Sequence, residues 1–156
     1  MRLIGIDPGT GILGFGVIDH HKGDNKLVDA GVIRTPAKED DAKRLVMIYD
    51  ELSEIIKHNK PEIMVVEKLF FAQNVTTAMT VAQARGIVLL SAKQNNMEIF
   101  EYTPLQIKQA LTGYGRADKK QIQEMVKILL KLKETPKPDD CADALAAAIT
   151  HTMTMR

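Results

Sequence analysis

The sequence predicts an α/β protein built on one mixed five-stranded sheet with helices on both faces. Three short apolar segments follow one another closely at the N-terminus, and two more occur later, each after a segment with helical periodicity. Strands joined by short turns pair antiparallel, whereas strands joined through a helix run parallel. The 156 residues contain no composition break or internal repeat, so we expect residues 1–156 to form a single domain.

The five predicted strands are short segments rich in Leu, Val and Ile, bounded by clusters of Gly, Asn, Asp and Lys. The fourth is an uninterrupted apolar run, which is typical of a strand buried on both faces in the middle of a sheet. The strands are expected at Arg2 to Asp7, Gly14 to Asp19, Leu27 to Arg34, Ile63 to Val66 and Met97 to Tyr102.

Five helices are predicted from apolar periodicity and from capping residues. Apolar residues at successive spacings of 3, 4 and 3 predict an amphipathic helix over residues 40–57, and a second helix is expected from about residue 77 to residue 93. The other three begin at capping signals. These signals are Thr103 with Gln106, Asp118 with Gln121, and Asp139 as the N-cap of the last helix.

Charge is distributed unevenly along the chain. The net charge is only +1, but residues 104–137 carry eight basic and three acidic side chains, 8 − 3 = +5, whereas residues 36–63 sum to 5 − 7 = −2. A basic region of this kind favours an anionic partner without indiscriminate electrostatic binding. The single Cys141 excludes an intramolecular disulfide, and no apolar run approaches 18 residues. We therefore expect a cytoplasmic protein with no membrane partner.

Two acids close predicted strands. Asp7 ends the first strand and precedes the turn Pro8 to Gly11, where it either caps the turn or holds a ligand. Glu67 ends the central apolar run, where a carboxylate is desolvated unless a cation or metal pairs with it. The alternative to a metal is a salt bridge from Glu67 to Lys68 or Arg2.

Asp140 and Asp143 lie three residues apart in the first turn of the last helix, on the side away from its apolar stripe. They either complement the helix dipole or hold a divalent cation that relieves their repulsion. Carboxylates without His or Cys partners indicate Mg²⁺ or Mn²⁺ rather than zinc, and two such ions can assist phosphodiester cleavage. His151 shows no zinc spacing, and we expect it on the surface or as a partner of the dipole at the helix C-terminus, with a role in the outer shell of the metal site as the alternative.

The order and spacing of four motifs resemble those of the bacterial RuvC-type Holliday junction resolvases over nearly the whole chain. These motifs are Ile4 to Gly9, Gln83 to Gly86, Gly115 to Lys119, and Asp140 to Leu145. The resemblance implies an RNase H-like fold, a homodimer, and Mg²⁺-dependent symmetric nicking of four-way DNA junctions in recombination and repair. It also implies 5′-phosphate and 3′-hydroxyl ends, two metal ions per site and a branch-migration helicase complex as partner.

The resemblance also assigns roles to individual residues. The metal-binding and catalytic acids would be Asp7, Glu67, Asp140 and Asp143, with Cys141 standing where a small Ala is usual. A DNA-facing aromatic matches Phe70, in a loop where exposed aromatics can stack on unpaired bases. The lysines expected to face DNA match Lys108 and Lys119, and their neighbours Arg116 and Lys120 are further candidates, although all four could be ordinary solvated surface charge.

Three further expectations stay open at this point. A helix spanning residues 75–90, with Ala78, Met79, Ala82 and Ile87, is the candidate dimer interface, although monomer core packing explains it equally well. A related nuclease acting on RNA in hybrids is one alternative function. An ATPase of the sugar-kinase or chaperone type is another, but this chain is too short for the two lobes that enclose ATP.

Overall fold

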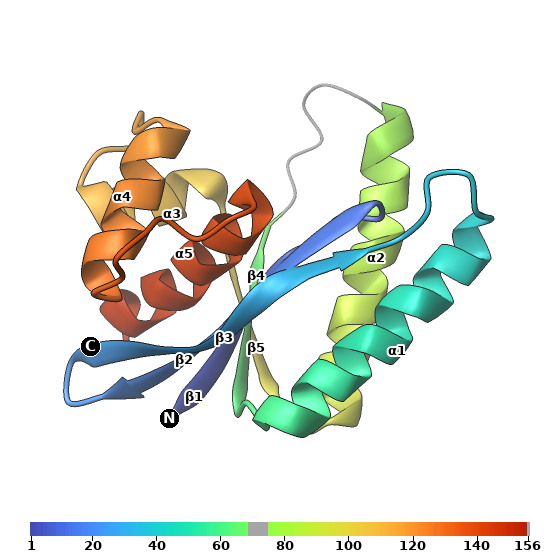
Figure 1. Cartoon of the computed structure of the whole chain (residues 1–156), viewed down its shortest axis with the longest axis horizontal. Coiled ribbons are helices and arrows are strands. Elements are labelled where there is room, and N and C mark those ends of the chain that lie inside the picture. The colour runs from blue at the N-terminus through green and yellow to red at the C-terminus, as the bar shows by residue number, and fades with distance from the viewer. Residues whose placement is uncertain (69–74, 156) are drawn as a thin grey trace.

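The computed structural model describes residues 1–68 and 75–155, which form one five-stranded mixed sheet covered by helices on both faces (Figure 1). The strand order is β3-β2-β1-β4-β5; β1 pairs antiparallel with β2 and β2 with β3, whereas β1 with β4 and β4 with β5 are parallel. The predicted fold class is therefore confirmed. The strands are β1 Arg2–Asp7, β2 Ile12–His21, β3 Asp24–Arg34, β4 Ile63–Glu67 and β5 Glu98–Tyr102.

Helices α1 and α2 cover one face of the sheet and α3, α4 and α5 cover the other, so the chain forms three layers (Figure 1). Capping boxes begin α3 at Thr103 and α4 at Asp118, as the sequence predicts. The helices are α1 Asp41–Asn59, α2 Val75–Gln94, α3 Pro104–Thr112, α4 Lys119–Leu129 and α5 Asp139–Thr154.

The N-terminal cap of α5 differs from the prediction. Pro138 occupies the N-cap position, and Asp139 is the first helical residue, without a side-chain capping hydrogen bond. Its carboxylate instead accepts a hydrogen bond from Gln123 Nε2 at 2.9 Å and lies 3.2 Å from Lys119 Nζ. Because Gln123 and Lys119 on α4 bind the Asp139 carboxylate, this carboxylate does not cap the N-terminus of α5.

Each face of the sheet has its own apolar core because side chains alternate along a strand. On β1, Ile4 and Ile6 pack toward α1 and α2, whereas Leu3 packs toward α5. On β4, Met64 and Val66 face α1 and α2, and Val65 faces α5. The alternation carries the last residue of each strand to the α5 side.

Glycines let α5 lie directly on the strands. A Cβ on Gly14 would lie 2.0 Å from the backbone oxygen of Asp140, and one on Gly5 would lie 1.9 Å from that of Ala144. Any side chain at either position would push the helix off the sheet. The spacing of these small residues thus places the first turn of α5 over β1 and β2.

The apolar stripe predicted for α5 is buried, but burial extends well beyond that stripe. Residues 141–142 and 144–152 are buried, and only Asp143 interrupts this run. The sheet covers one side of α5, and α3 and α4 cover the other. Because α5 packs between the sheet and the helices α3 and α4, its buried surface is wider than one stripe, and its sequence loses much of the amphipathic contrast.

The expectation that no segment is apolar enough to cross a membrane is also wrong by length and composition. Among the helices described here, α2 has the length and mean hydropathy of a span, with 22% of that window buried in the protein. Its buried residues Ala84, Val88 and Ala92 belong to the core under the sheet, and Arg85 forms an ion pair with Glu101. Part of the apolar surface of α2 therefore packs in the core of the protein.

Candidate active site

Asp7 and Glu67 lie beside each other at the end of two neighbouring strands. Because β1 and β4 are parallel and Ile6 is aligned with Val66, the two acids are the next residues on each strand. Both project toward α5, by the alternation of side chains. The two acids lie side by side because β1 and β4 are parallel and in this register.

Asp140 and Asp143 face the same end of the sheet from α5. Both are half-buried, and the electrostatic influence of both acids reaches Asp7. The structure therefore brings the four predicted acids together from an early strand, a central strand and a late helix. Roles as metal ligands stay predictions.

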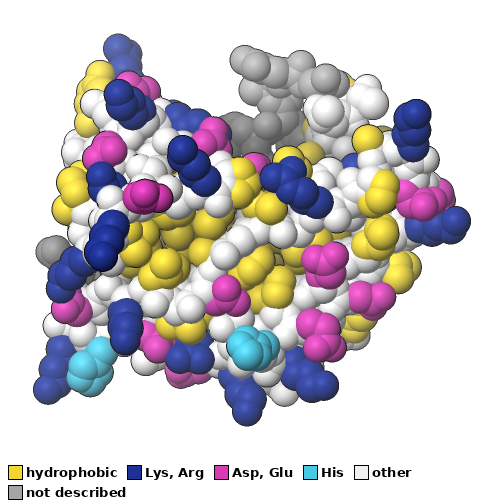
Figure 2. Space-filling model, viewed as in Figure 1, with side chains coloured by type: hydrophobic (Ala, Val, Ile, Leu, Met, Phe, Trp, Pro, Cys, Tyr) yellow, Lys and Arg dark blue, Asp and Glu magenta, His cyan; other side chains and the backbone are white. Residues whose placement is uncertain are grey.

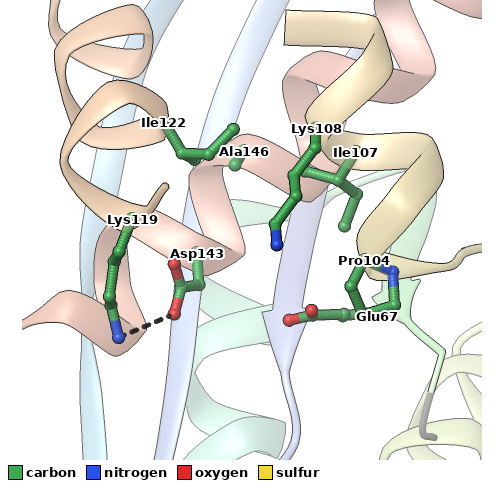
Figure 3. A pocket seen from close by; sticks show the side chains of 8 residues that line it. All are labelled: Glu67, Pro104, Ile107, Lys108, Lys119, Ile122, Asp143 and Ala146. Atoms are coloured by element: carbon green, nitrogen blue, oxygen red, sulfur yellow. Dashed lines mark ion pairs between the residues drawn. The ribbon is translucent and has the colours of Figure 1, made fainter. Parts of the chain in front are cut away.

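A pocket of about 270 Å³ opens beside these acids (Figure 3). Lys119 Nζ lies 3.5 Å from Asp143 Oδ2, and Lys108 extends from α3 toward Glu67. The apolar walls, which sequence reasoning missed, come from α3, α4 and α5. The lining residues are Glu67, Pro104, Ile107, Lys108, Lys119, Ile122, Asp143 and Ala146.

The carboxyl groups oppose one another's ionisation. Burial, and then the negative charges of Glu67, Asp143 and Asp140, raise the pKa of Asp7 from 3.8 to about 8. Burial and the charge of Asp143 raise the pKa of Glu67 to about 7, although a hydrogen bond from Asp7 and the positive charges of Lys119 and Lys108 oppose the rise. Burial likewise raises the pKa of Asp143. The protein thus concentrates negative charge where its own cations do not balance it.

The donor chemistry of this cluster fits a hard divalent cation. All four groups offer carboxylate oxygens, and a cation between them would remove the repulsion that raises their pKa values. Within residues 1–68 and 75–155, however, no three His, Cys, Asp or Glu side chains already gather closely enough to hold one ion.

The salt-bridge alternative for Glu67 finds no support. Arg2 Nε lies 2.8 Å from Asp19 Oδ1 instead, on the opposite end of β1. Glu67 forms no ion pair with any described residue, Lys68 included.

The remaining DNA candidates divide by position. Lys108 and Lys119 line the pocket, and Arg116 is exposed in the turn between α3 and α4. Lys120 instead lines a separate groove between α3 and α4, so the structure does not bring it to the acids. Phe70 lies outside the described residues.

His151 and Cys141 are both inside the protein. The surface position expected for His151 is wrong: the residue is 3% exposed, its Nδ1 is 2.8 Å from the Tyr102 hydroxyl, and its ring packs on Phe100 with centroids 4.1 Å apart. It does not line the acidic pocket. Burial raises the pKa of Cys141 to about 11, so its thiol stays protonated and poorly reactive.

Comparison of the sequence finds one family. The family model described as crossover junction endodeoxyribonuclease RuvC matches residues 3–151. The RuvC protein of Desulfitobacterium hafniense is 56% identical over 153 residues, covering 97% of this chain and 92% of the relative. That of Fusobacterium nucleatum is 54% identical over 151 residues, covering 97% and 80%.

Comparison of the structure agrees. The RuvC structure from Thermus thermophilus superposes with a TM-score of 0.91 at 38% identity, covering 98% of this chain and 94% of that one. The same protein in complex with a Holliday junction substrate gives 0.93 at 37% identity, with 98% and 93% covered. The yeast mitochondrial Holliday junction resolvase Ydc2 shares the fold, with a TM-score of 0.70 at 13% identity.

Proposed function

Because the chain belongs to the RuvC family of crossover junction endodeoxyribonucleases, we propose that it resolves four-way DNA junctions by paired, symmetric nicking in recombination and repair. The observation that carries this proposal is the convergence of Asp7, Glu67, Asp140 and Asp143 at one edge of the sheet, beside Lys108 and Lys119. Acids with neighbouring cations suit hydrolysis of a phosphodiester. We expect 5′-phosphate and 3′-hydroxyl ends.

The four acids would hold Mg²⁺, for which Mn²⁺ should substitute, with two ions per site. Bound there, divalent cations activate water and neutralise charge on the phosphate. Lys119, held 3.5 Å from Asp143, and Lys108, directed toward Glu67, supply positive charge on the open side of the pocket. They orient the scissile phosphate and stabilise the negative charge that develops during cleavage.

A junction-cleavage assay tests this function. The protein should nick a four-way junction in Mg²⁺, but not linear duplex or an RNA–DNA hybrid, and the ends should be ligatable. Asp7→Asn should abolish nicking and spare junction binding, because it removes charge without removing volume. Full nicking by that variant, or preferred cleavage of the hybrid, would overturn the assignment.

DNA binding should use the basic side of the molecule. In the space-filling view, acidic side chains gather over α1, whereas Lys and Arg side chains, with some acidic ones among them, line the edge on which α4 lies (Figure 2). Lys108, Arg116, Lys119 and Lys120 are proposed phosphate contacts, and Phe70 a proposed base contact. Alanine at each lysine should weaken binding and lower its salt dependence.

We also propose a homodimer formed through α2. Val75 is 83% exposed, Met79 65% and Leu90 48%. With exposed Ala82 and Gly86 between them, these residues recur every three or four positions and form one apolar face. A two-fold axis through this face would match the symmetry of the junction and supply the second nick.

The four residues predicted for the dimer interface differ in how exposed they are. Met79 and Ala82 are exposed as the dimer requires, and Ala78 is half-buried, but Ile87 packs against the core under the sheet. The face that α2 leaves uncovered therefore differs by a few residues from the predicted one.

Sedimentation with matched variants tests the dimer. Met79→Glu should convert the dimer to monomer and suppress paired nicking, because a charge would be buried in the interface. Ile128→Glu, at a position 61% exposed on α4, is the control and should stay dimeric. Wild-type protein that sediments only as monomer at micromolar concentration would exclude the dimer. A cytoplasmic location and a branch-migration helicase complex are proposals that co-purification from cells would test.

A further inference from the structure

A chain of buried hydroxyl groups ties the turn after Asp7 to both helices on the far face of the sheet. Thr10 Oγ1 donates to the backbone oxygen of Thr80 on α2 at 2.7 Å. Thr35 Oγ1 donates to the backbone oxygen of Thr10 at 2.6 Å and accepts from Arg44 Nε, on α1, at 2.8 Å. Thr10 and Thr35 are 7% and 8% exposed, so this arrangement is held inside the protein.

The guanidinium of Arg44 consequently lies on the turn itself. A Cβ on Gly11 would be 3.2 Å from Arg44 Nη2, so the absence of a side chain at Gly11 makes room for this group. Gly11 follows Asp7 by four residues, a distance of at most about 14 Å along the chain. Arg44 therefore contacts the turn that follows Asp7, from the α1 side of the sheet.

This guanidinium is anchored by one nitrogen only. Neither Nη atom makes a hydrogen bond within the described residues, and neither is among their fully buried atoms that lack a partner. No carboxylate of residues 1–68 or 75–155 pairs with Arg44, and residues 69–74 contain no Asp or Glu. A cation that contacts the turn after Asp7 and has no counter-ion among the described residues is suited to an anionic ligand.

We propose that Arg44 binds a backbone phosphate of the junction DNA, within a few nucleotides of the cut, on the side of the active site opposite Lys108 and Lys119. The inference rests on the proposed junction-cleaving function. An arginine fixed through Nε presents its two Nη groups as a planar fork, which matches two phosphate oxygens. Thr35 is the positioning residue that orients this fork, and the two basic sides would hold the strand across the acids.

Binding measurements on the Asp7→Asn protein, which should not cut, test the proposal. Arg44→Gln should weaken junction binding about tenfold and lower the slope of log Kd against log salt concentration by about one. Lys43→Gln is the matched control: it removes the same charge from the next residue, whose exposed side chain lies 3.5 Å from Glu39. It should change neither quantity appreciably.

A second arm identifies the phosphate and separates contact from folding. Junctions carrying one neutral methylphosphonate at successive positions near the cut should include one that Arg44→Gln and parent bind equally. Thr35→Val keeps the charge but removes the anchor, so it should weaken binding less and leave the salt slope unchanged.

The outcomes are distinct. If Arg44→Gln lowers the melting temperature but leaves affinity and salt slope at parental values, Arg44 is only a structural tie and the proposal is wrong. Equal losses in Lys43→Gln, or additive losses at every methylphosphonate position, also overturn it. If the parent fails to bind the junction at all, the proposed function itself falls, and this inference with it.

Discussion

Replacing Asp7 by Asn should stabilise the metal-free protein at alkaline pH. The folded protein buries this carboxyl group beside three other acids, and burial together with their charges raises its pKa from 3.8 to about 8. Asparagine has nearly the same shape but no charge. The substitution therefore tests the electrostatic account of the site in the absence of DNA.

The sign and size follow from linkage. An acid whose pKa is higher in the folded state destabilises the fold as it ionises, so its penalty is absent below about pH 4, grows through the interval to about pH 8, and is complete above it. At about 1.4 kcal/mol per pH unit, a difference of about four units sets a limit of about 6 kcal/mol. Side-chain rotation and water entry relieve part of this. We expect Asp7→Asn to gain about 2 kcal/mol above about pH 8, a rise in Tm of about 4–8 °C.

Thermal unfolding in EDTA, followed at several pH values, measures the effect. The two proteins should have similar Tm near about pH 4 and diverge as pH rises. Asp19→Asn is the control with the opposite sign, because a hydrogen bond from Arg2 lowers the pKa of Asp19 and its stabilisation is lost as pH falls. An Asp7→Asn protein that is no more stable than wild type at high pH would refute the reasoning.

Three further outcomes are expected. Gly14→Ala should lose about 1–3 kcal/mol of stability and most nicking activity. The reason is that its Cβ would meet the Asp140 backbone oxygen at 2.0 Å and shift the turn that carries Asp143. A variant with wild-type Tm and cleavage would contradict the close packing of α5 on β2. Millimolar Mg²⁺ should raise the Tm of wild type more at about pH 8 than at about pH 6, because the carboxyl ligands must lose protons to bind it. It should barely affect the Tm of Asp7→Asn. Calorimetry that detects no proton release on Mg²⁺ binding would argue against carboxyl ligands. Tyr102→Phe should cost about 1–2 kcal/mol through the lost 2.8 Å contacts to His151 and Thr154, with cleavage rates unchanged; a matching loss of cleavage would place this cluster in the site.

Local pattern was sufficient for the elements. The range predicted for the first strand, Arg2 to Asp7, is that of β1, and the capping boxes at Thr103 and Asp118 begin α3 and α4. The strands β2 and β3 run further than predicted, to paired His21 and Asp24, because backbone hydrogen bonds continue the hairpin through polar residues. The polarity of a side chain indicates whether it is buried, but it does not indicate where backbone hydrogen bonding between two strands ends.

The four acids of the candidate site could be picked out from the sequence, but the residues around them could not all be predicted. Asp7 and Glu67 were visible because each carboxylate closes an apolar strand. His151 was misplaced because its position near the end of the chain gave no sign of the buried contact with Tyr102. Lys120 lines a different groove from Lys119 because adjacent residues on a helix point in different directions, and its contact with DNA stays a prediction. Arg44 carried no signal at all in the sequence, since its partner Thr35 belongs to a preceding loop.

The sequence by itself determined which segments form strands and helices, which acids end them, and to which family the chain belongs, since these depend on short-range spacing and residue type. The tertiary structure alone decided that burial of α5 extends beyond its predicted stripe, that α2 leaves an apolar face uncovered, and that Arg44 lies against the turn after Asp7. The reason is physical. Burial and charge coupling depend on distances between residues far apart in the chain, and only the packing of the three layers sets those distances.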